Sequence, residues 1–178
     1  MDISNKKHFL TVKDHSVSKE TFDLYHDETM DMLVTYPQPS LDTLGKYYES
    51  VDYISHTDSK RSLFEIAYHF VKSIALKNKL ELINSLQPAK GRILDIGAGT
   101  GDFLSVAKQN GWQAVGVEPS DKAKAIALKK EVVFVEDTAE LENQSFDVIS
   151  MWHVLEHVPN LDNQIKELKR LLKPNGSL

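Results

Sequence analysis

The 178-residue sequence contains no cysteine, which excludes disulfide bonds, thiolate metal ligands and a cysteine nucleophile. It also lacks any apolar run near the roughly 20 residues that a membrane-spanning helix needs. No basic segment followed by an apolar stretch opens the chain, so we expect no signal peptide. These absences together favour a cytoplasmic protein without a membrane span.

An excess of positive charge is missing as well. The sequence has 21 Lys and Arg against 26 Asp and Glu, a net charge of −5, with acids and bases interspersed. No basic face for nucleic acid is therefore expected. The length fits one domain with a small appendage.

Three glycines at every second position mark the stretch around which the chain is organised. Gly97, Gly99 and Gly101 follow an apolar run over residues 92–96 and precede a helical pattern that starts at Phe103. A strand, a glycine turn and a helix bring backbone N–H groups close to a ligand. Glycine suits such a turn because it has no Cβ and tolerates positive φ. The spacing differs from the Gly-x-Gly-x-x-Gly of dinucleotide-binding domains, which argues against a nicotinamide-dependent oxidoreductase.

Two acidic residues accompany the glycines. Asp95 lies two residues before Gly97, and a second predicted strand over residues 114–118 ends in Glu118. An acid at the tip of that strand can accept hydrogen bonds from both hydroxyls of a ribose. The glycines taken alone also fit a purely structural turn in another α/β domain.

The rest of the chain from residue 61 alternates helices and strands. Apolar strands are predicted at 132–135 and 146–150, and helices at 122–130 and 161–172. Residues 61–86 predict a long helix with a break near Asn78, whose apolar residues are expected to pack against the sheet: Leu63, Ile66, Ala67, Phe70, Val71, Ile74, Leu82, Ile83 and Leu86. The alternation predicts an α/β fold with a doubly wound parallel sheet of about four to five strands.

Several motifs of the sequence point to one family. They are Asp95-x-Gly97-x-Gly99-x-Gly101, the acid at 118, Phe-Asp-Val-Ile at 146–149 and Val-Leu-Glu-His-Val at 154–158. In these motifs the chain resembles class I S-adenosylmethionine-dependent methyltransferases. The similarity is to the bacterial branch that includes ubiquinone- and methionine-pathway-type enzymes. It implies a Rossmann-like fold, S-adenosylmethionine as cofactor with S-adenosylhomocysteine as product, and methyl transfer to a small-molecule acceptor.

The resemblance also implies roles for single residues. The glycine turn would approach the methionine and ribose, Asp95 would orient that turn, and Glu118 would take the ribose hydroxyls. Asp137 and Thr138 would border the adenine, unless their loop makes no contact with it. The cofactor-binding residues implied in this way are Asp95, Gly97, Ala98, Gly99, Gly101, Glu118, Pro119, Asp137, Thr138, Met151 and Trp152, the last two near the adenine ring or the donor sulfur.

Two histidines are candidates for a general base, should the acceptor need to lose a proton. His153 and His157 lie at the carboxyl end of a predicted strand, and on a helix their spacing would place them on one face. The alternative for each is a helix-capping or core histidine.

The first 60 residues are expected to form a β-hairpin and helical appendage. Residues 35–56 resemble the lead-in of methyltransferases with an N-terminal zinc knuckle, whose cysteine positions are taken here by Tyr25, His26 and Met30. The resemblance therefore implies a knuckle without metal, and the spacing of His8, His15 and His26 matches no zinc pattern. Tyr48 and Tyr53 are candidates for a lid over the cofactor, or else for core packing.

We therefore expect two domains, an appendage over residues 1–60 and a methyltransferase domain over residues 61–178. Residues 174–178 resemble the turn into the fifth strand of the family's fold, so we expect the domain to end before its last strands. An exposed sheet edge would then favour self-association. The alternative function is a non-catalytic module that binds S-adenosylmethionine or a partner protein.

Overall fold

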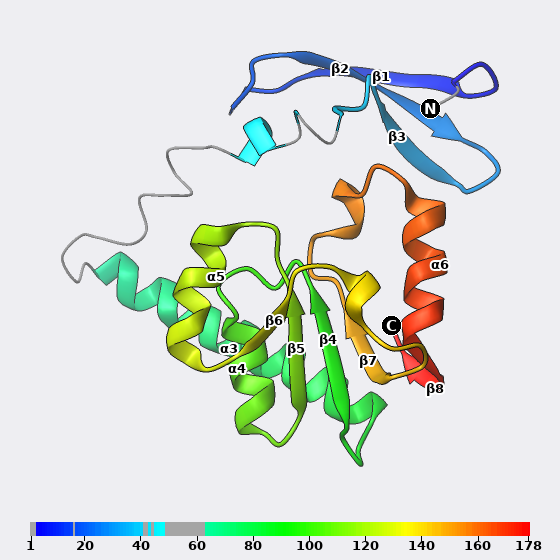
Figure 1. Ribbon diagram of the computed structural model, residues 1–178. Coiled ribbons are helices and arrows are strands. Elements are labelled where there is room, and N and C mark those ends of the chain that lie inside the picture. The colour runs from blue at the N-terminus through cyan, green and yellow to red at the C-terminus, as the bar shows by residue number, and fades with distance from the viewer. Residues whose placement is uncertain (1–2, 16, 41–42, 44, 49–62) are drawn as a thin grey trace. The chain divides into compact units, whose positions relative to one another are not determined.

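The computed structural model describes residues 3–15, 17–40, 43, 45–48 and 63–178. The chain divides into two compact units, residues 1–60 and 61–178, and each is described by itself (Figure 1). Tyr53 and the side chain of Tyr48, the two lid candidates, lie outside the described part of the chain.

The N-terminal unit is an antiparallel three-stranded sheet with the order β1-β2-β3. Its elements are β1 (Lys7–Lys13), β2 (Thr21–Asp27), β3 (Met32–Tyr36) and the short 3₁₀ helix η1 (Gly45–Tyr48). At the positions expected for a lost zinc knuckle, Tyr25 packs edge-on against Tyr36 and His26 Nε2 lies 3.0 Å from Asp31 Oδ1. The expected hairpin is confirmed, and β1 adds a third strand to it.

The second unit contains a five-stranded sheet with the order β6-β5-β4-β7-β8. Every neighbouring pair in it is parallel. Its strands are β4 (Arg92–Ile96), β5 (Gln113–Val117), β6 (Val133–Val135), β7 (Phe146–Ser150) and β8 (Leu172–Ser177). The predicted Rossmann-like fold is confirmed. The segment expected as a turn at 174–178 instead belongs largely to β8 and pairs with β7.

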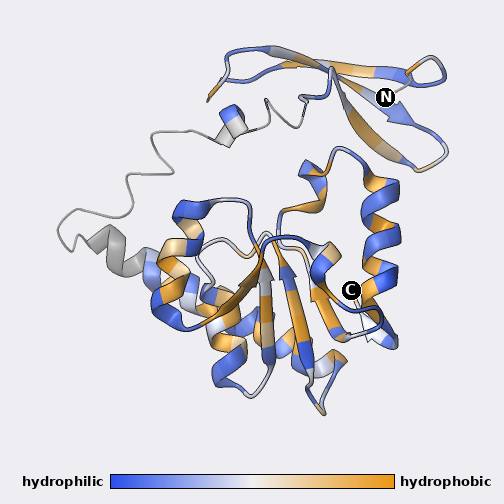
Figure 2. Ribbon diagram, in the orientation of Figure 1, coloured by the Kyte–Doolittle hydropathy of each residue, from blue (hydrophilic) through white to orange (hydrophobic). Residues whose placement is uncertain are grey.

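Helices cover both faces of this sheet. The α-helices are α3 (Leu63–Leu86), α4 (Asp102–Gln109), α5 (Asp121–Ala127) and α6 (Leu161–Leu171). On one face Ile83 of α3 and Phe103 of α4 pack with Ile93, and α5 joins α4 through Ala127 and Leu104. The other face is covered by α6, which shows alternating polar and apolar residues in Figure 2, whereas β7 is largely apolar. Among the described helices, none is both long and apolar enough to cross a membrane.

Helix α3 differs from its prediction in two respects. It is continuous through Asn78, so the expected break is wrong. The apolar face expected against the sheet is also wrong at most of its described positions, because the following residues are exposed: Phe70, Val71, Ile74, Leu82 and Leu86. Ile83, which the prediction included, does pack against the sheet, together with Leu76 and Leu80, which it did not include. Apolar residues surround this helix, so their spacing alone allowed more than one choice of buried face.

Candidate functional site

The sheet order brings four strand ends together at one edge. β4 lies in the centre, with β5 on one side and β7 on the other, and the connections from β4 and β7 lead to opposite faces. In open parallel sheets this switch point leaves a crevice beyond the carboxyl ends of the strands. The predicted binding residues follow these ends: the glycine turn after β4, Glu118 after β5, Asp137 after β6 and Met151 after β7.

The glycine turn is held tightly except at its centre. The N–H groups of Gly97 and Ala98 donate to Val117 O at 2.8 and 3.1 Å, which ties the turn to β5. A Cβ added to Gly97 would lie 2.4 Å from Val154 Cγ2. At Gly99 no described atom lies within 4 Å of such a Cβ, although φ there is +53°. Gly99 therefore faces open space, the feature that close approach of a ligand requires.

Glu118 lies against this turn. Its Oε2 accepts from Gly99 N at 2.8 Å, and its Oε1 accepts from Ser120 N at 2.9 Å. A carboxylate has about four lone-pair sites, so each oxygen keeps acceptor capacity beyond these bonds. Ser120 itself caps α5, as predicted, by accepting from Ala123 N at 3.3 Å. The cap and the turn thus fix the position of the carboxylate. Pro119, the next residue after Glu118, is exposed.

Asp95 is the most deeply buried acid of the site. It is only 3% exposed, and its Oδ1 accepts from Ser150 Oγ on the neighbouring strand at 2.6 Å. Burial raises the pKa of Asp95 to about 7, against the hydrogen bond from Ser150 and the positive charge of Lys79, which lower it. A buried carboxyl whose pKa is this strongly perturbed, at a crevice, is typical of a functional site.

Lys79 and Trp152 lie on the same face of the sheet. Lys79 Nζ is 4.4 Å from the centroid of the Trp152 ring, and Phe103 packs edge-on against that ring at 5.7 Å. Burial lowers the pKa of Lys79, and the attraction of Asp95 partly offsets this. Sequence reasoning missed Lys79. The available signal was its position one turn before Ile83, a member of the predicted apolar face that is indeed buried.

Met151 and Trp152 are not brought together. Met151 packs on the α6 face with Leu94 and Ile149, whereas Trp152 packs on the opposite face near Phe103. Side chains alternate between the two faces along an extended segment, and this alternation continues past the end of β7. Of this pair, only Trp152 therefore shares a face with Lys79.

Asp137 and Thr138 form a local cap at the end of β6. Asp137 Oδ1 accepts from Ala139 N at 2.8 Å, and Glu140 Oε1 accepts from Asp137 N at 3.3 Å, which caps the short helix η4 (Thr138–Glu140). Thr138 O accepts from Arg170 Nη2 at 2.9 Å. Asp137 is exposed, so its second oxygen stays accessible at this strand end.

The two histidines do not lie on one helical face, so that expectation is wrong. The helix in this segment is η5 (Leu155–His157), a single 3₁₀ turn that starts after His153. His153 has a left-handed backbone with φ of 58°, and its side chain is 91% exposed, with Nδ1 3.7 Å from Glu156 Oε1. His157 is the last residue of η5 and is exposed as well.

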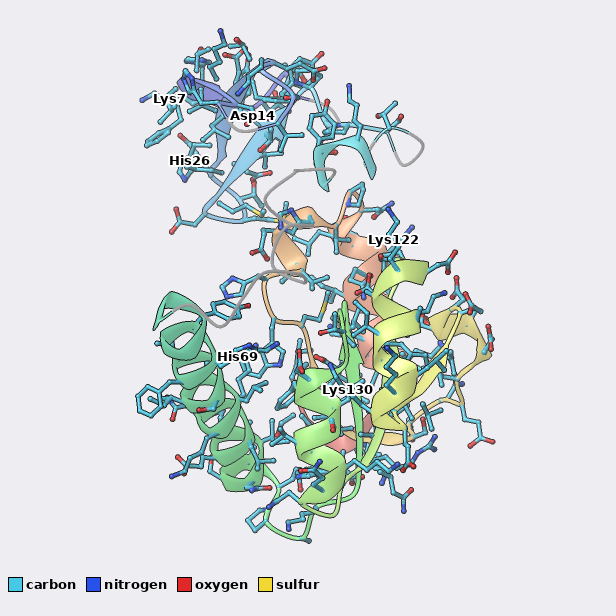
Figure 3. The ribbon with its side chains drawn as sticks, turned by 90° about the vertical axis from the view of Figure 1, so that its left-hand side faces the viewer. Lys7, Asp14, His26, His69, Lys122 and Lys130 are labelled. Carbon is cyan, nitrogen blue, oxygen red and sulfur yellow. The ribbon has the colours of Figure 1, made fainter. Side chains whose placement is uncertain are left out.

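The start of α4, directly after the glycine turn, is fixed by ion pairs. Lys130, labelled in Figure 3, donates to Thr100 O at 2.6 Å and to Asp102 Oδ1 at 2.8 Å. Lys72 Nζ lies 2.7 Å from Asp102 Oδ2. Burial works to raise the pKa of Asp102, but the hydrogen bonds from Lys130, Lys72 and Thr100 outweigh it and lower the pKa to about 2. These contacts hold the helix start against the rest of the unit.

The sequence is similar to known methyltransferases. Residues 67–178 match the family model described as a methyltransferase domain. The chain is 32% identical over 110 residues to a ubiquinone biosynthesis O-methyltransferase of Albidiferax ferrireducens, covering 55% of this chain and 44% of that one. It is 35% identical over 108 residues to a demethylmenaquinone methyltransferase of Chlorobaculum tepidum, covering 57% and 43%.

A solved structure has a similar fold. The crystal structure of the PH0226 protein from Pyrococcus horikoshii superimposes with a TM-score of 0.51 at 25% identity, covering 65% of this chain and 57% of that chain. The chain spans about half the length of the curated relatives that it matches. The family model covers more than half of the chain. The chain therefore belongs to the methyltransferase-domain family, as the resemblance predicted.

Proposed function

We propose that this chain binds S-adenosylmethionine at the carboxyl edge of its parallel sheet and transfers the methyl group to a small-molecule acceptor. The observation that carries the proposal is the pairing of open space at Gly99 with the Glu118 carboxylate fixed beside it. A ribose needs an acceptor for its two hydroxyls and a turn that admits the sugar, and these residues supply both.

The remaining groups of the site also suit this cofactor. Its methionine part carries an ammonium and a carboxylate, and the α3 face of the site offers the carboxyl of Asp95 and the ammonium of Lys79. Asp137, exposed at the end of β6, is our candidate for the adenine edge, together with Thr138. The ligand would then lie across the ends of β4, β5 and β6.

When bound, the cofactor supplies a methyl group on a sulfonium, which is already activated for displacement. The protein's task is then mainly to bind and orient, and good orientation is worth up to roughly 7–11 kcal/mol. An acceptor that must lose a proton also needs a base, for which His153 and His157 stay our candidates. Because His153 is largely exposed, an acceptor could reach it.

The two named relatives support an acceptor of the quinone type, since one takes its name from ubiquinone biosynthesis and the other from demethylmenaquinone. A net charge of −5 favours such a small molecule over nucleic acid. A cytoplasmic location and self-association through the sheet edge stay predictions.

Calorimetric titration tests the proposal. The intact protein should bind S-adenosylmethionine and S-adenosylhomocysteine, and Glu118→Gln should weaken both by about tenfold or more, as expected for a lost charge-assisted hydrogen bond. Glu136→Gln is the matched control, because Glu136 follows β6 and pairs only with Lys124 among the described residues. The proposal is wrong if the intact protein takes up neither compound. Release of S-adenosylhomocysteine with phenolic acceptors then tests turnover and separates an enzyme from a binding module.

A further inference from the structure

The two tryptophans of the chain differ in how their indole N–H groups are satisfied. Trp112 Nε1 donates to Asn84 Oδ1 at 3.0 Å. Trp152 Nε1 is shielded from solvent and finds no acceptor among the residues that the structure describes. Buried donors in native proteins are nearly always paired, because an unpaired one loses its bond to water without replacement. The N–H of Trp152 therefore points to an acceptor that is not one of these residues.

The surroundings of Trp152 indicate the charge of that acceptor. Lys79 Nζ lies 4.4 Å from the centre of its ring, and no described carboxylate lies within ion-pair distance of this ammonium. Asp95 is the acid whose attraction raises the pKa of Lys79, and its Oδ1 already accepts a hydrogen bond from Ser150 Oγ. An N–H donor and a partly buried cation therefore share one face with no anion between them. A carboxylate satisfies both donors at once.

We infer that Trp152 is a binding residue for the methionine end of the cofactor, where its Nε1–H and Lys79 Nζ together hold the α-carboxylate. This inference rests on the proposed function. It assigns Trp152 to the amino-acid part of the ligand, and not to the adenine. The candidates for the adenine, Asp137 and Thr138, follow β6, whereas Trp152 follows β7 on the α3 side of the sheet.

The arrangement also explains why a tryptophan serves there. The ring packs edge-on against Phe103 and passes under Lys79, so both the face and the edge of the indole are fixed before a ligand arrives. A fixed donor loses little conformational freedom on binding, which favours affinity. Phenylalanine would keep the packing and the cation–π contact but would lose the donor.

Titration with two ligands tests the inference. S-Adenosylhomocysteine carries the α-carboxylate, and 5′-methylthioadenosine lacks the whole amino-acid part. Trp152→Phe should weaken S-adenosylhomocysteine by about tenfold, the usual effect of one hydrogen bond to a charged group, and leave 5′-methylthioadenosine unchanged. Trp112→Phe is the matched control, since its N–H is paired inside the protein, and it should change neither affinity.

Two results would overturn the inference while the proposed function stands. Equal weakening of both ligands by Trp152→Phe would mean that the ring contacts the adenosine, and no weakening of either would mean that the N–H has no role in binding. If the intact protein binds neither ligand, the proposed function itself fails.

Thermal unfolding without ligand gives an independent readout. Both substitutions remove part of a packed ring, but Trp152→Phe also removes an unpaired donor, so it should lower the midpoint by less than Trp112→Phe, which breaks an internal hydrogen bond as well. A drop for Trp152→Phe as large as that for Trp112→Phe would show that the Trp152 N–H is already paired in the free protein, which contradicts the inference.

Discussion

At the scale of single residues, Asp95 makes stability depend on pH. Its folded-state pKa of about 7 lies above its ordinary value of 3.8, because the residue is buried. The folded state therefore binds this proton more tightly than the unfolded state does. The free energy of unfolding should fall as pH rises from about 4 to about 7. Urea denaturation at a series of pH values measures this slope.

The variant Asp95→Asn isolates this contribution. An amide does not titrate, so the difference in unfolding free energy between the variant and the unchanged protein should shift in favour of the variant as pH rises from about 4 to about 7. Asp102 acts in the opposite sense but only at lower pH, because its folded pKa of about 2 lies below 3.8. A difference that does not vary with pH would contradict the raised pKa of Asp95.

The glycine turn offers a second prediction for single residues. Gly97 and Gly99 both have positive φ, so Ala at either position carries similar backbone strain. Only at Gly97 does the new Cβ meet a neighbour, Val154 Cγ2 at 2.4 Å. Gly97→Ala should therefore destabilise the fold by about 1–3 kcal/mol more than Gly99→Ala. Gly99→Ala should instead weaken cofactor binding. Chemical denaturation and titration of both variants separate these effects, and equal unfolding free energies would argue against the contact with Val154.

At the scale of elements, α3 has one buried and one exposed apolar face. Ile83 is 2% exposed and Ile74 is 44% exposed on the same helix. Ile83→Ala should cost about 2–5 kcal/mol of unfolding free energy, as large-to-small core changes do, whereas Ile74→Ala should stay within about 0.5 kcal/mol. The two variants have the same change in helix propensity, so they control for each other. A loss at Ile74 that matches the loss at Ile83 would mean that another surface covers the outer face.

The elements that could be predicted from the sequence are those whose signals are local. Short patterns with one physical solution determine three of these features. They are the strand-glycine-helix unit around Gly99, the cap at Ser120 and the parallel direction of the strands. The buried face of α3 is harder to predict. Apolar residues lie on all sides of this helix, so their positions in the sequence do not identify the face that packs against the sheet.

The prediction for the turn after β7 was wrong for a different reason. The spacing of His153 and His157 fits a helix, but the left-handed backbone of His153 ends the extended segment before η5 begins. Histidine is among the side chains that adopt this conformation more often than most. Nothing in the composition of the segment distinguishes the two outcomes, so the backbone of the turn had to be observed.

At the scale of the whole molecule, the chain consists of two units whose contacts are mainly internal, residues 1–60 and 61–178. All the residues that we assign to the cofactor lie in the second unit, between Lys79 and Trp152. That unit contains its own sheet, with helices on both faces and continuous apolar clusters. We therefore propose that it is an independent domain and that the first unit is not needed to bind the cofactor.

A shortened chain that begins at residue 61 tests this proposal. We expect it to unfold in one cooperative transition and to bind S-adenosylhomocysteine within about threefold of the full chain, because no assigned contact is removed. The same chain with Glu118→Gln is the control for specific binding. If removal of residues 1–60 weakens the affinity as much as Glu118→Gln does, the first unit supplies part of the cofactor site, as a lid formed by the candidates Tyr48 and Tyr53 would. If only methyl transfer is lost while affinity is kept, the first unit instead serves the acceptor, since binding and turnover then depend on different parts of the chain.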